Sequence, residues 1–416
     1  MDRMRRTLGA ATALVTIVTA LPALAQTQNG GTPGEWMMRY TSARTLGLGG
    51  AYVALADDPL GVLWNPAGLS GMDQNEVRFE HAAMFEGTAI NGAGFAVPGS
   101  HLPSLGVVVL SQRSGDIQRT NELNDDLGSF HDSETAYMLT ASRALSTRMA
   151  LGLNVKFVQQ TVEDFNANGF GLDVGATYEA TPSLRLGASV VNLGGPNHTL
   201  RDVEEKYPTG VRAGFAAYLF QGRAMVAMDV DHASGPGTRF HAGGEYWIQP
   251  AIGLRMGYDQ DAAAGGFSYR FHPQYQVDYA ASNGELGLEH RVGLSYRFSG
   301  FFASSSATPT VFSPTGETAV TRFDLNSRTK ADPREWTLDV RNKADEVVRR
   351  FGGQGQPPSH IQWDGKDETG MPLPDGIYRY RLVVTDKVGR IVNSPEQTVE
   401  IATSGPSGTV PVLPGN

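Results

Sequence analysis

Apolar and polar residues alternate through the middle of the chain, in segments of about ten residues that end at Gly, Pro, Asn and Asp turns. In the segment 151–157, Leu, Val and Phe occupy the odd positions, while Gly, Asn and Lys occupy the even ones. The segments 170–179, 184–190 and 291–298 repeat this pattern. A period of two places the two sets on opposite faces of a β-strand. The length of about 9–11 residues is typical of strands that cross a bilayer at a tilt.

Counting these segments predicts about fourteen strands between residues 76 and 300 of an all-β chain. They lie near 76–84, 89–97, 104–112, 134–144, 148–160, 168–179, 183–193, 208–219, 222–232, 238–247, 250–258, 263–271, 274–282 and 290–298. An even number places both ends of a barrel on one side of the membrane, which for bacterial barrels is the periplasm. The longer connections, near 115–133 and 194–207, then lie on the outer side.

A soluble β-sandwich would show the same alternation, because one face of its sheets is also wet. Two features favour a transmembrane antiparallel barrel with its apolar face outside. The polar face is rich in glycine and in charges of both signs, which suits a crowded barrel interior. The apolar segments also end in aromatic residues such as Tyr178, Trp247 and Tyr258, which match the girdles at membrane interfaces.

The N-terminus, 1–25, predicts a cleavable signal peptide. Arg3, Arg5 and Arg6 precede an apolar stretch, and Ala23-Leu24-Ala25 forms a cleavage site. An uncleaved anchor helix is the alternative. The chain has no cysteine, which excludes a lipoprotein anchor, a disulfide framework and a thiolate metal site. The net charge is −9 and no basic stripe occurs, so we expect no nucleic-acid partner.

The composition changes after residue 300. Residues 301–310 are rich in Ser, Ala, Thr and Pro and predict a linker. Residues 311–402 carry more charge, and their short apolar segments are separated by turns such as Asp364-Gly365 and Asp375-Gly376. About seven short strands in roughly 90 residues indicate a small β-sandwich. The tail, 403–416, is rich in Gly, Pro and Ser and is expected to be disordered.

The segment from Ala43 to Leu69 carries a distinctive order of residues: Gly49-Gly50-Ala51, then Asp57-Asp58-Pro59, then Trp64-Asn65-Pro66-Ala67-Gly68. It resembles the start of PorV/PorQ-like outer-membrane proteins, which are related to the FadL fatty-acid transporters. The resemblance covers about residues 36–300. It implies a fourteen-stranded barrel, here 76–300, whose N-terminal segment, 26–75, folds into or against the lumen as a hatch.

The C-terminal part resembles the FlgD-type Ig-like domain. The matching residues are Phe312-Ser313-Pro314, Trp363-Asp364-Gly365-Lys366-Asp367 and Pro374-Asp375-Gly376-Ile377-Tyr378. Family members usually carry an Asn-Gly-Asp-Gly-like turn after the Ser-Pro pair. This chain has Thr315-Gly316-Glu317 at that position, so the resemblance does not imply that the turn binds an ion in this chain.

Two groups of residues are candidates for a site. The first is the hatch motif, which either forms a structural corner or holds and releases a plug; it comprises Gly49, Gly50, Asp57, Asp58, Trp64, Asn65, Pro66 and Gly68. The second consists of lumen-facing charges, which either line a substrate path or pair with one another; they are Lys156, Asp173, Arg212, Arg255, Arg270 and Arg291. Tyr296 and Phe298 end the last strand, which in proteins that the chain resembles is the signal for barrel assembly.

No motif for catalysis, a cofactor or a metal occurs. The glycines near Gly49 lack the strand and helix of a dinucleotide loop, and no H-E-x-x-H or G-x-S-x-G is present. The aspartate pairs lack the spacing of a calcium loop and suit turns or caps. We therefore expect no enzyme, no cofactor and no bound metal.

Three functions fit these expectations. By resemblance to PorV, the barrel binds exported proteins as an accessory of a type IX-like secretion system. The alternative, by resemblance to FadL, is a transporter for hydrophobic small molecules. A structural role is the third, with the Ig-like domain as a tether. The luminal face is predicted to be charged, which disfavours a path for fatty acids and therefore favours the first function. Outer-membrane lipid is an expected partner in every case.

Overall fold

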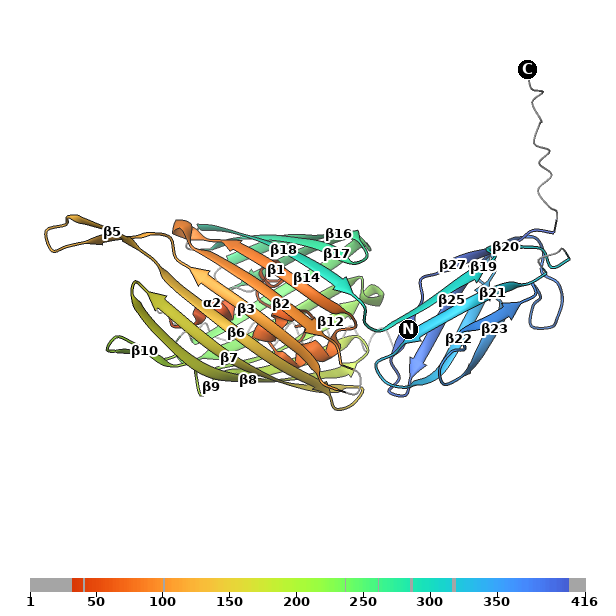
Figure 1. The fold of residues 1–416 in the computed structure, drawn as a ribbon, viewed down its shortest axis with the longest axis horizontal. Helices are drawn as coiled ribbons and strands as arrows, with labels where there is room; N and C mark the ends of the chain where they lie inside the picture. Colours follow the sequence, from red (N-terminus) through yellow and green to blue (C-terminus); the bar gives the residue numbers. More distant parts are fainter. Residues whose placement is uncertain are drawn as a thin grey trace, which may run out of the picture.

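The computed structural model describes residues 32–39, 42–99, 102–235, 237–260, 262–284, 287–315 and 319–403. The expected signal peptide and the expected disordered tail beyond Thr403 lie outside the described residues. Figure 1 shows a barrel followed, along the long axis of the molecule, by a smaller sandwich.

The barrel is a closed sheet of fourteen antiparallel strands, as the hydrophobic pattern predicts, and β1 pairs with β18 to close it. The strands are β1 Asn75–Ala83, β2 Ala89–Val97, β3 Ser104–Arg113, β6 Asp132–Ala144, β7 Met149–Val162, β8 Phe165–Thr181, β9 Leu184–Leu193, β12 Gly210–Leu219, β13 Ala224–Ala233, β14 Gly237–Gln249, β15 Ile252–Asp259, β16 Ala262–His272, β17 Tyr275–Gly284 and β18 Gly287–Phe298. The predicted strands differ from these by a few residues at their ends.

The outer face of the barrel is apolar. Leu151, Val174 and Leu294 are 42, 38 and 44% exposed, while their neighbours of opposite parity are more buried. Apolar side chains point outward in the same way on strands all around the closed sheet. A continuous apolar belt of this kind belongs in lipid and would be a liability in water. The barrel is therefore a transmembrane barrel.

The end of the barrel where β1 begins and β18 ends faces the sandwich, and we call it the proximal mouth. The opposite end, the distal mouth, carries longer connections. A hairpin of β4 Ile117–Thr120 and β5 Asp126–Phe130 projects far from the barrel there (Figure 1). A second hairpin, β10 His198–Leu200 and β11 Val203–Glu205, leads to the buried Tyr207. Short 3₁₀ turns, η3 Phe85–Gly87 and η4 Phe220–Gly222, join other strands.

The segment before β1 fills the lumen, where Figure 1 shows its short helices inside the barrel, and we call residues 42–74 the hatch. After α2 Glu35–Arg39 it contains α3 Ala43–Gly47, η1 Pro59–Leu63 and η2 Pro66–Gly71. Ser42 caps α3, Asp58 caps η1 and Asn65 caps η2, and a proline directly follows the caps of η1 and η2. The sequence itself therefore sets where each of these short helices begins. No helix in the part of the chain that the structure describes is long and apolar enough to span a membrane.

The C-terminal sandwich packs a three-stranded sheet, β19-β21-β24, against a six-stranded one that contains β20, β22, β23, β25, β26 and β27. Their bounds are β19 Phe302–Thr308, β20 Val311–Phe312, β21 Thr321–Arg328, β22 Pro333–Arg341, β23 Val347–Gln354, β24 His360–Trp363, β25 Gly376–Asp386, β26 Ile391–Asn393 and β27 Gln397–Ile401. Trp363, Phe323, Phe312 and Tyr380 lie at the centre of its core.

The prediction of a linker over 301–310 is wrong, because most of that segment forms β19, which pairs with β21. Its inward positions are Ala303, Ser305 and Ala307, which are buried under the opposite sheet. Small side chains let the two sheets approach each other there, and in the sequence the same small residues have the composition of a linker.

Candidate functional site: the hatch inside the barrel

Glycines on the inner wall let the hatch backbone lie directly against the strands. A Cβ atom on Gly243 would stand 2.3 Å from the carbonyl oxygen of Leu48, and one on Gly257 would stand 2.1 Å from the amide nitrogen of Gly49. Gly243 and Gly257 pair across β14 and β15, so together they form a notch that receives the hatch turn at 48–50. Gly49 and Gly50 form this turn with φ values of +61° and +85°, which favour glycine.

Wall side chains satisfy hatch backbone groups that no secondary structure satisfies. The Asp229 carboxylate accepts hydrogen bonds from the amides of Tyr52 and Val53, at 2.5 and 2.7 Å. Arg212 donates to the carbonyl of Leu63 at 2.8 Å. Ser189 donates to the carbonyl of Trp64 at 2.7 Å. Because buried backbone groups are costly when unpaired, these contacts fix the hatch in one position.

The residues of the predicted hatch motif lie close together and hold the turns of the hatch to one another by hydrogen bonds, a set of contacts that we call the internal brace. The Trp64 indole donates to the carbonyl of Gly50 at 2.9 Å. The Asn65 amide donates to Val53 of the hatch at 2.8 Å and to Ala176 of the wall at 3.0 Å. Asp58 accepts from the Tyr52 hydroxyl at 2.5 Å while capping η1.

The remaining motif residues act at the surface and the corner of this brace. Asp57 pairs with Arg44 at 2.5 Å and is partly exposed toward the proximal mouth. Pro66 begins η2. A Cβ on Gly68 would stand 2.1 Å from the carbonyl oxygen of Ala56, so only glycine fits the corner.

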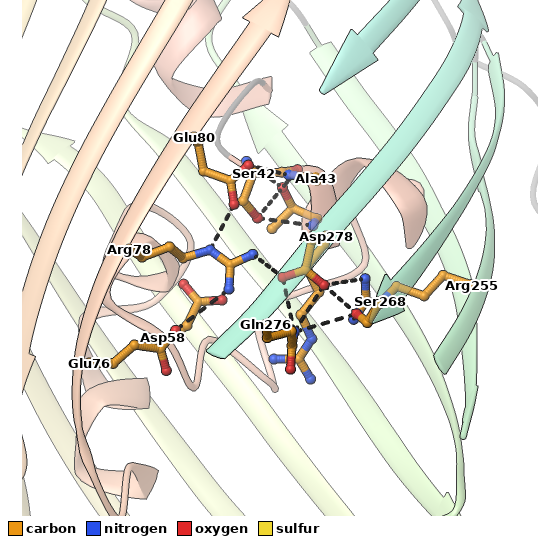
Figure 2. A network of polar contacts seen from close by, with 12 residues as sticks. Ser42, Ala43, Asp58, Glu76, Arg78, Glu80, Arg255, Ser268, Gln276 and Asp278 are labelled. Carbon is orange, nitrogen blue, oxygen red and sulfur yellow. Dashed lines mark hydrogen bonds and ion pairs between the residues drawn. The ribbon is translucent and has the colours of Figure 1, made fainter. Parts of the chain in front are cut away.

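A charged network on one side of the lumen meets α3 (Figure 2). Arg78 on β1 donates to Glu80 at 2.7 Å and to Asp278 on β17 at 2.9 Å. Asp278 also accepts from Arg255 at 3.0 Å, and Ser268 and Gln276 surround it. Glu80 in turn accepts from the amide of Ala43, the first residue of α3, at 3.0 Å. The network therefore joins the wall to the start of the hatch.

The predicted lumen-facing charges do point inward, but the structure distributes them over separate contacts. Lys156 pairs with Asp173 at 2.9 Å, on β7 and β8. Arg212 anchors the hatch, as described above, and Arg255 belongs to the charged network.

The two others are Arg270 and Arg291. Arg270 is half-buried, donates to Gln276 at 2.7 Å and stacks over the Trp247 ring. Arg291 forms an ion pair with Glu289. These charges are therefore occupied within the wall and the hatch, and they do not form one continuous charged path.

The lumen wall on β2, β3, β6 and β7, next to β1, also carries a group of apolar side chains, which corrects the expectation of a charged inner face. Ile90, Val108, Leu110, Met138 and Val158 on β2, β3, β6 and β7 are almost fully buried and point inward. They form one cluster with hatch residues that include Leu60, Leu63 and Leu69. We call this contact between the hatch and strands β2, β3, β6 and β7 the apolar seam.

The seam was missed from the sequence, although a signal for it exists. Residues 107–110 read Val-Val-Val-Leu without alternation. A continuous apolar run indicates a strand that is buried on one face and lies against lipid or protein on the other. Here Val107 and Val109 face outward, while Val108 and Leu110 face the hatch.

Polar cavities lie at the proximal mouth. One of about 330 Å³ opens between the hatch and strands β14–β18, and Arg44, Asp57, Glu245 and Arg270 line it. A second of about 310 Å³ lies between η2, the barrel rim and the sandwich. Within the described residues no cluster of three or more His, Asp or Glu side chains is arranged to hold a metal ion.

Tyr296 and Phe298 lie together at the proximal end of β18. Their rings stack with centroids 5.1 Å apart, and Phe298 also stacks with Phe95 at 6.3 Å. Tyr275 stacks on Tyr296 at 4.8 Å. These aromatic rings form a patch at the rim of the barrel.

Several solved structures share the barrel fold. The chain is similar to the CymD monoaromatic hydrocarbon channel, with 15% identity, a TM-score of 0.50, and coverage of 63% of this chain and 98% of that one. It also matches the Pseudomonas putida toluene transporter TodX (14% identity, TM-score 0.48, 62% and 97% covered) and a Pseudomonas aeruginosa FadL homologue (12%, 0.47, 62% and 98%). No curated protein sequence matches the chain.

The fold and the hatch define the class of this protein as a transmembrane β-barrel whose lumen is filled by its own N-terminal segment. The C-terminal part of the chain can be assigned to a family, because residues 310–388 match the family model of the FlgD Ig-like domain. The chain is thus a transmembrane barrel that carries a FlgD Ig-like domain after its last strand.

Proposed function

We propose that this protein is a non-enzymatic channel that lets small hydrophobic molecules cross the outer membrane, with the hatch as its gate. The apolar seam carries the proposal. It offers a route along one side of the lumen where a solute without polar groups can replace the contacts between hatch and wall. The charged network, which joins β1, β15 and β17 to the start of α3, keeps the hatch attached while the seam opens.

The resemblance in fold to a monoaromatic hydrocarbon channel supports this function, although a fold by itself hosts many functions. This reverses the order of the two functions that we expected from the sequence. A PorV-like role in protein secretion is supported by none of the matches reported above.

The proposal includes an orientation. Fourteen strands bring both ends of the barrel to the proximal mouth, and the connections at that mouth are short. In bacterial barrels the short turns face the periplasm. We therefore place the proximal mouth and the Ig-like domain in the periplasm, and the β4–β5 hairpin outside the cell.

Uptake of toluene into vesicles whose outer leaflet contains lipopolysaccharide, which slows the entry of apolar solutes, tests the proposal, with protein-free vesicles of the same lipids as the reference. Leu110→Asn places an amide in the seam, whereas Leu110→Met nearly conserves volume and apolar character. We expect Leu110→Asn to lower protein-dependent toluene uptake about tenfold or more, and Leu110→Met to stay within about twofold of the parent. An amide without a partner in an apolar site costs about 1–3 kcal/mol, which sets this scale.

Equal toluene uptake by Leu110→Asn and Leu110→Met would show that the solute does not pass along the apolar seam, and it would overturn the proposed mechanism. Toluene uptake no faster than in empty vesicles would overturn the function itself. Folding of each variant is checked beforehand by the heat-dependent mobility of the barrel on gels.

A further inference from the structure

The Ig-like domain reaches into the proximal mouth and holds the end of the hatch. Lys330 lies in the connection between β21 and β22 and is only 7% exposed. Its ammonium group donates to the carbonyl of Ser70 and, at 3.0 Å, to that of Met72. Ser70 belongs to the last turn of η2, where carbonyls lack partners within the helix. A lysine at this position therefore caps the hatch from outside the barrel.

A second contact fixes the same stretch. The amide of Phe301 donates to the carbonyl of Asp73 at 2.7 Å, directly after β18. The Phe301 ring is 6% exposed, and the Lys330 ammonium lies 5.6 Å from its centroid. Three carbonyls within residues 70–73 are thus held by groups that follow the barrel in the chain.

We infer that the Ig-like domain is a clamp on the gate: when docked, it keeps the hatch closed, and when it leaves the proximal mouth, the hatch is released. The inference rests on the proposed function, because it makes the hatch the moving part of a channel. Residues 70–73 lie at the end of the hatch, close to the start of β1 at Asn75, so contacts that hold them restrain the hatch where it joins the wall.

The docked interface is suited to reversible contact. Cavities of about 310 and 190 Å³ lie on either side of Lys330, and Arg390 lines both. Their walls are mostly polar, with Ser70, Arg143, Arg148 and Arg390 among them. Polar interfaces between domains of one chain separate more readily than large apolar ones. The clamp therefore depends on a few directed hydrogen bonds, and Lys330 makes two of them.

Thiol labelling of the complete protein in detergent or vesicles tests the clamp. The chain has no cysteine, so Met72→Cys introduces a single thiol at a hatch position that is 5% exposed. In this background, Lys330→Met removes the two donated hydrogen bonds and keeps an unbranched side chain. Lys343→Met, in the exposed β22–β23 turn of the same domain, is the matched control. Phe301→Ala is a second clamp variant, in case Lys330→Met does not assemble.

We expect Lys330→Met to raise the labelling rate by a polar maleimide about tenfold or more, because hydrogen bonds to a charged donor are among the stronger ones. Phe301→Ala should raise it in the same direction, and Lys343→Met should leave it unchanged. Unchanged labelling in both clamp variants would overturn the clamp. An equal rise in Lys343→Met would also overturn it, because the effect would then not be local.

Toluene uptake by the same variants separates the clamp from the channel. Faster labelling together with faster uptake in Lys330→Met supports both proposals. Faster labelling without any protein-dependent uptake, in parent or variant, leaves the clamp intact and rejects the channel. Normal uptake with unchanged labelling rejects the clamp alone.

Discussion

Adding one methyl group at Gly243 should open the hatch, whereas the same addition at Gly244 should not. The two glycines are neighbours on β14 and point to opposite faces of the barrel wall. A Cβ on Gly243 would stand 2.3 Å from the carbonyl oxygen of Leu48 and 2.8 Å from its carbon. A Cβ on Gly244 would have its nearest neighbour, the carbonyl oxygen of Met225, at 3.5 Å.

The size of the effect follows from these distances. A carbon and a carbonyl oxygen rest at about 3.3 Å, so the hatch backbone must retreat by about 1 Å in Gly243→Ala. It cannot rotate away as a flexible side chain would, because the contact is with backbone. Overpacking of this kind costs about 1–3 kcal/mol. Since about 1.4 kcal/mol is a factor of ten, the open hatch should become about 5 to 140 times more populated.

Hydrogen exchange read by mass spectrometry measures this directly, because hatch amides exchange only when the hatch opens. The amides of Leu48, Gly49 and Ala51 all donate within the hatch and serve as reporters. Gly243→Ala should accelerate their exchange by the factor given above. Gly244→Ala should match the parent, or exchange slightly more slowly because alanine stiffens the strand. Identical exchange in the two variants would show that the notch in the wall does not hold the hatch, and the reasoning from close approach would fail.

Three further outcomes follow from the same structure. Asp229→Ala should accelerate hydrogen exchange of the Tyr52 and Val53 amides, because each buried amide left unpaired costs about 1–3 kcal/mol. Asp229→Asn should have a smaller effect in the same assay. Leu153→Arg, on the lipid-facing side of β7, should destabilise folding into vesicles by about 2–4 kcal/mol, whereas Asp164→Arg in the turn beyond β7 should change the folding midpoint little. Burial and the nearby Arg390 lower the pKa of Lys330 from 10.5 to about 8. Between these two pH values the docked domain binds fewer protons than the free one, so docking should strengthen as the pH rises and weaken as it falls. The rate of hatch labelling in Lys330→Met, divided by the rate in the parent, should therefore grow from pH 8 to pH 10, and a constant ratio would contradict this linkage.

Much of the fold could be predicted from the sequence because the signals that define it are local. Whether a residue of a β-strand faces lipid or lumen depends only on parity along the strand, so the segment 151–157 shows its two faces without any knowledge of its neighbours. Turn residues mark the strand ends for the same reason. The FlgD-type domain was also recognisable, because its Trp363-Asp364-Gly365 turn is contiguous in sequence.

The candidate site was predictable only in part. The hatch motif could be named from the sequence, and its caps at Ser42, Asp58 and Asn65 lie within three residues of the amides that they bind. The partners of the lumen charges could not be named. Arg78 meets Asp278 across 200 positions of sequence, and this pairing depends on the closure of β1 onto β18 and on the stagger of the strands.

The sequence by itself determined which residues form strands, which of their faces is apolar, and where the small domain begins to differ from the barrel, since each of these depends on neighbours within a few positions. Only the tertiary structure decided that a part of the inner wall is apolar, that residues 302–308 form a strand, and that Lys330 caps the hatch. These features arise where segments far apart in the chain become neighbours, and closing a barrel around its own N-terminal segment creates such neighbours without leaving a periodic pattern in the sequence.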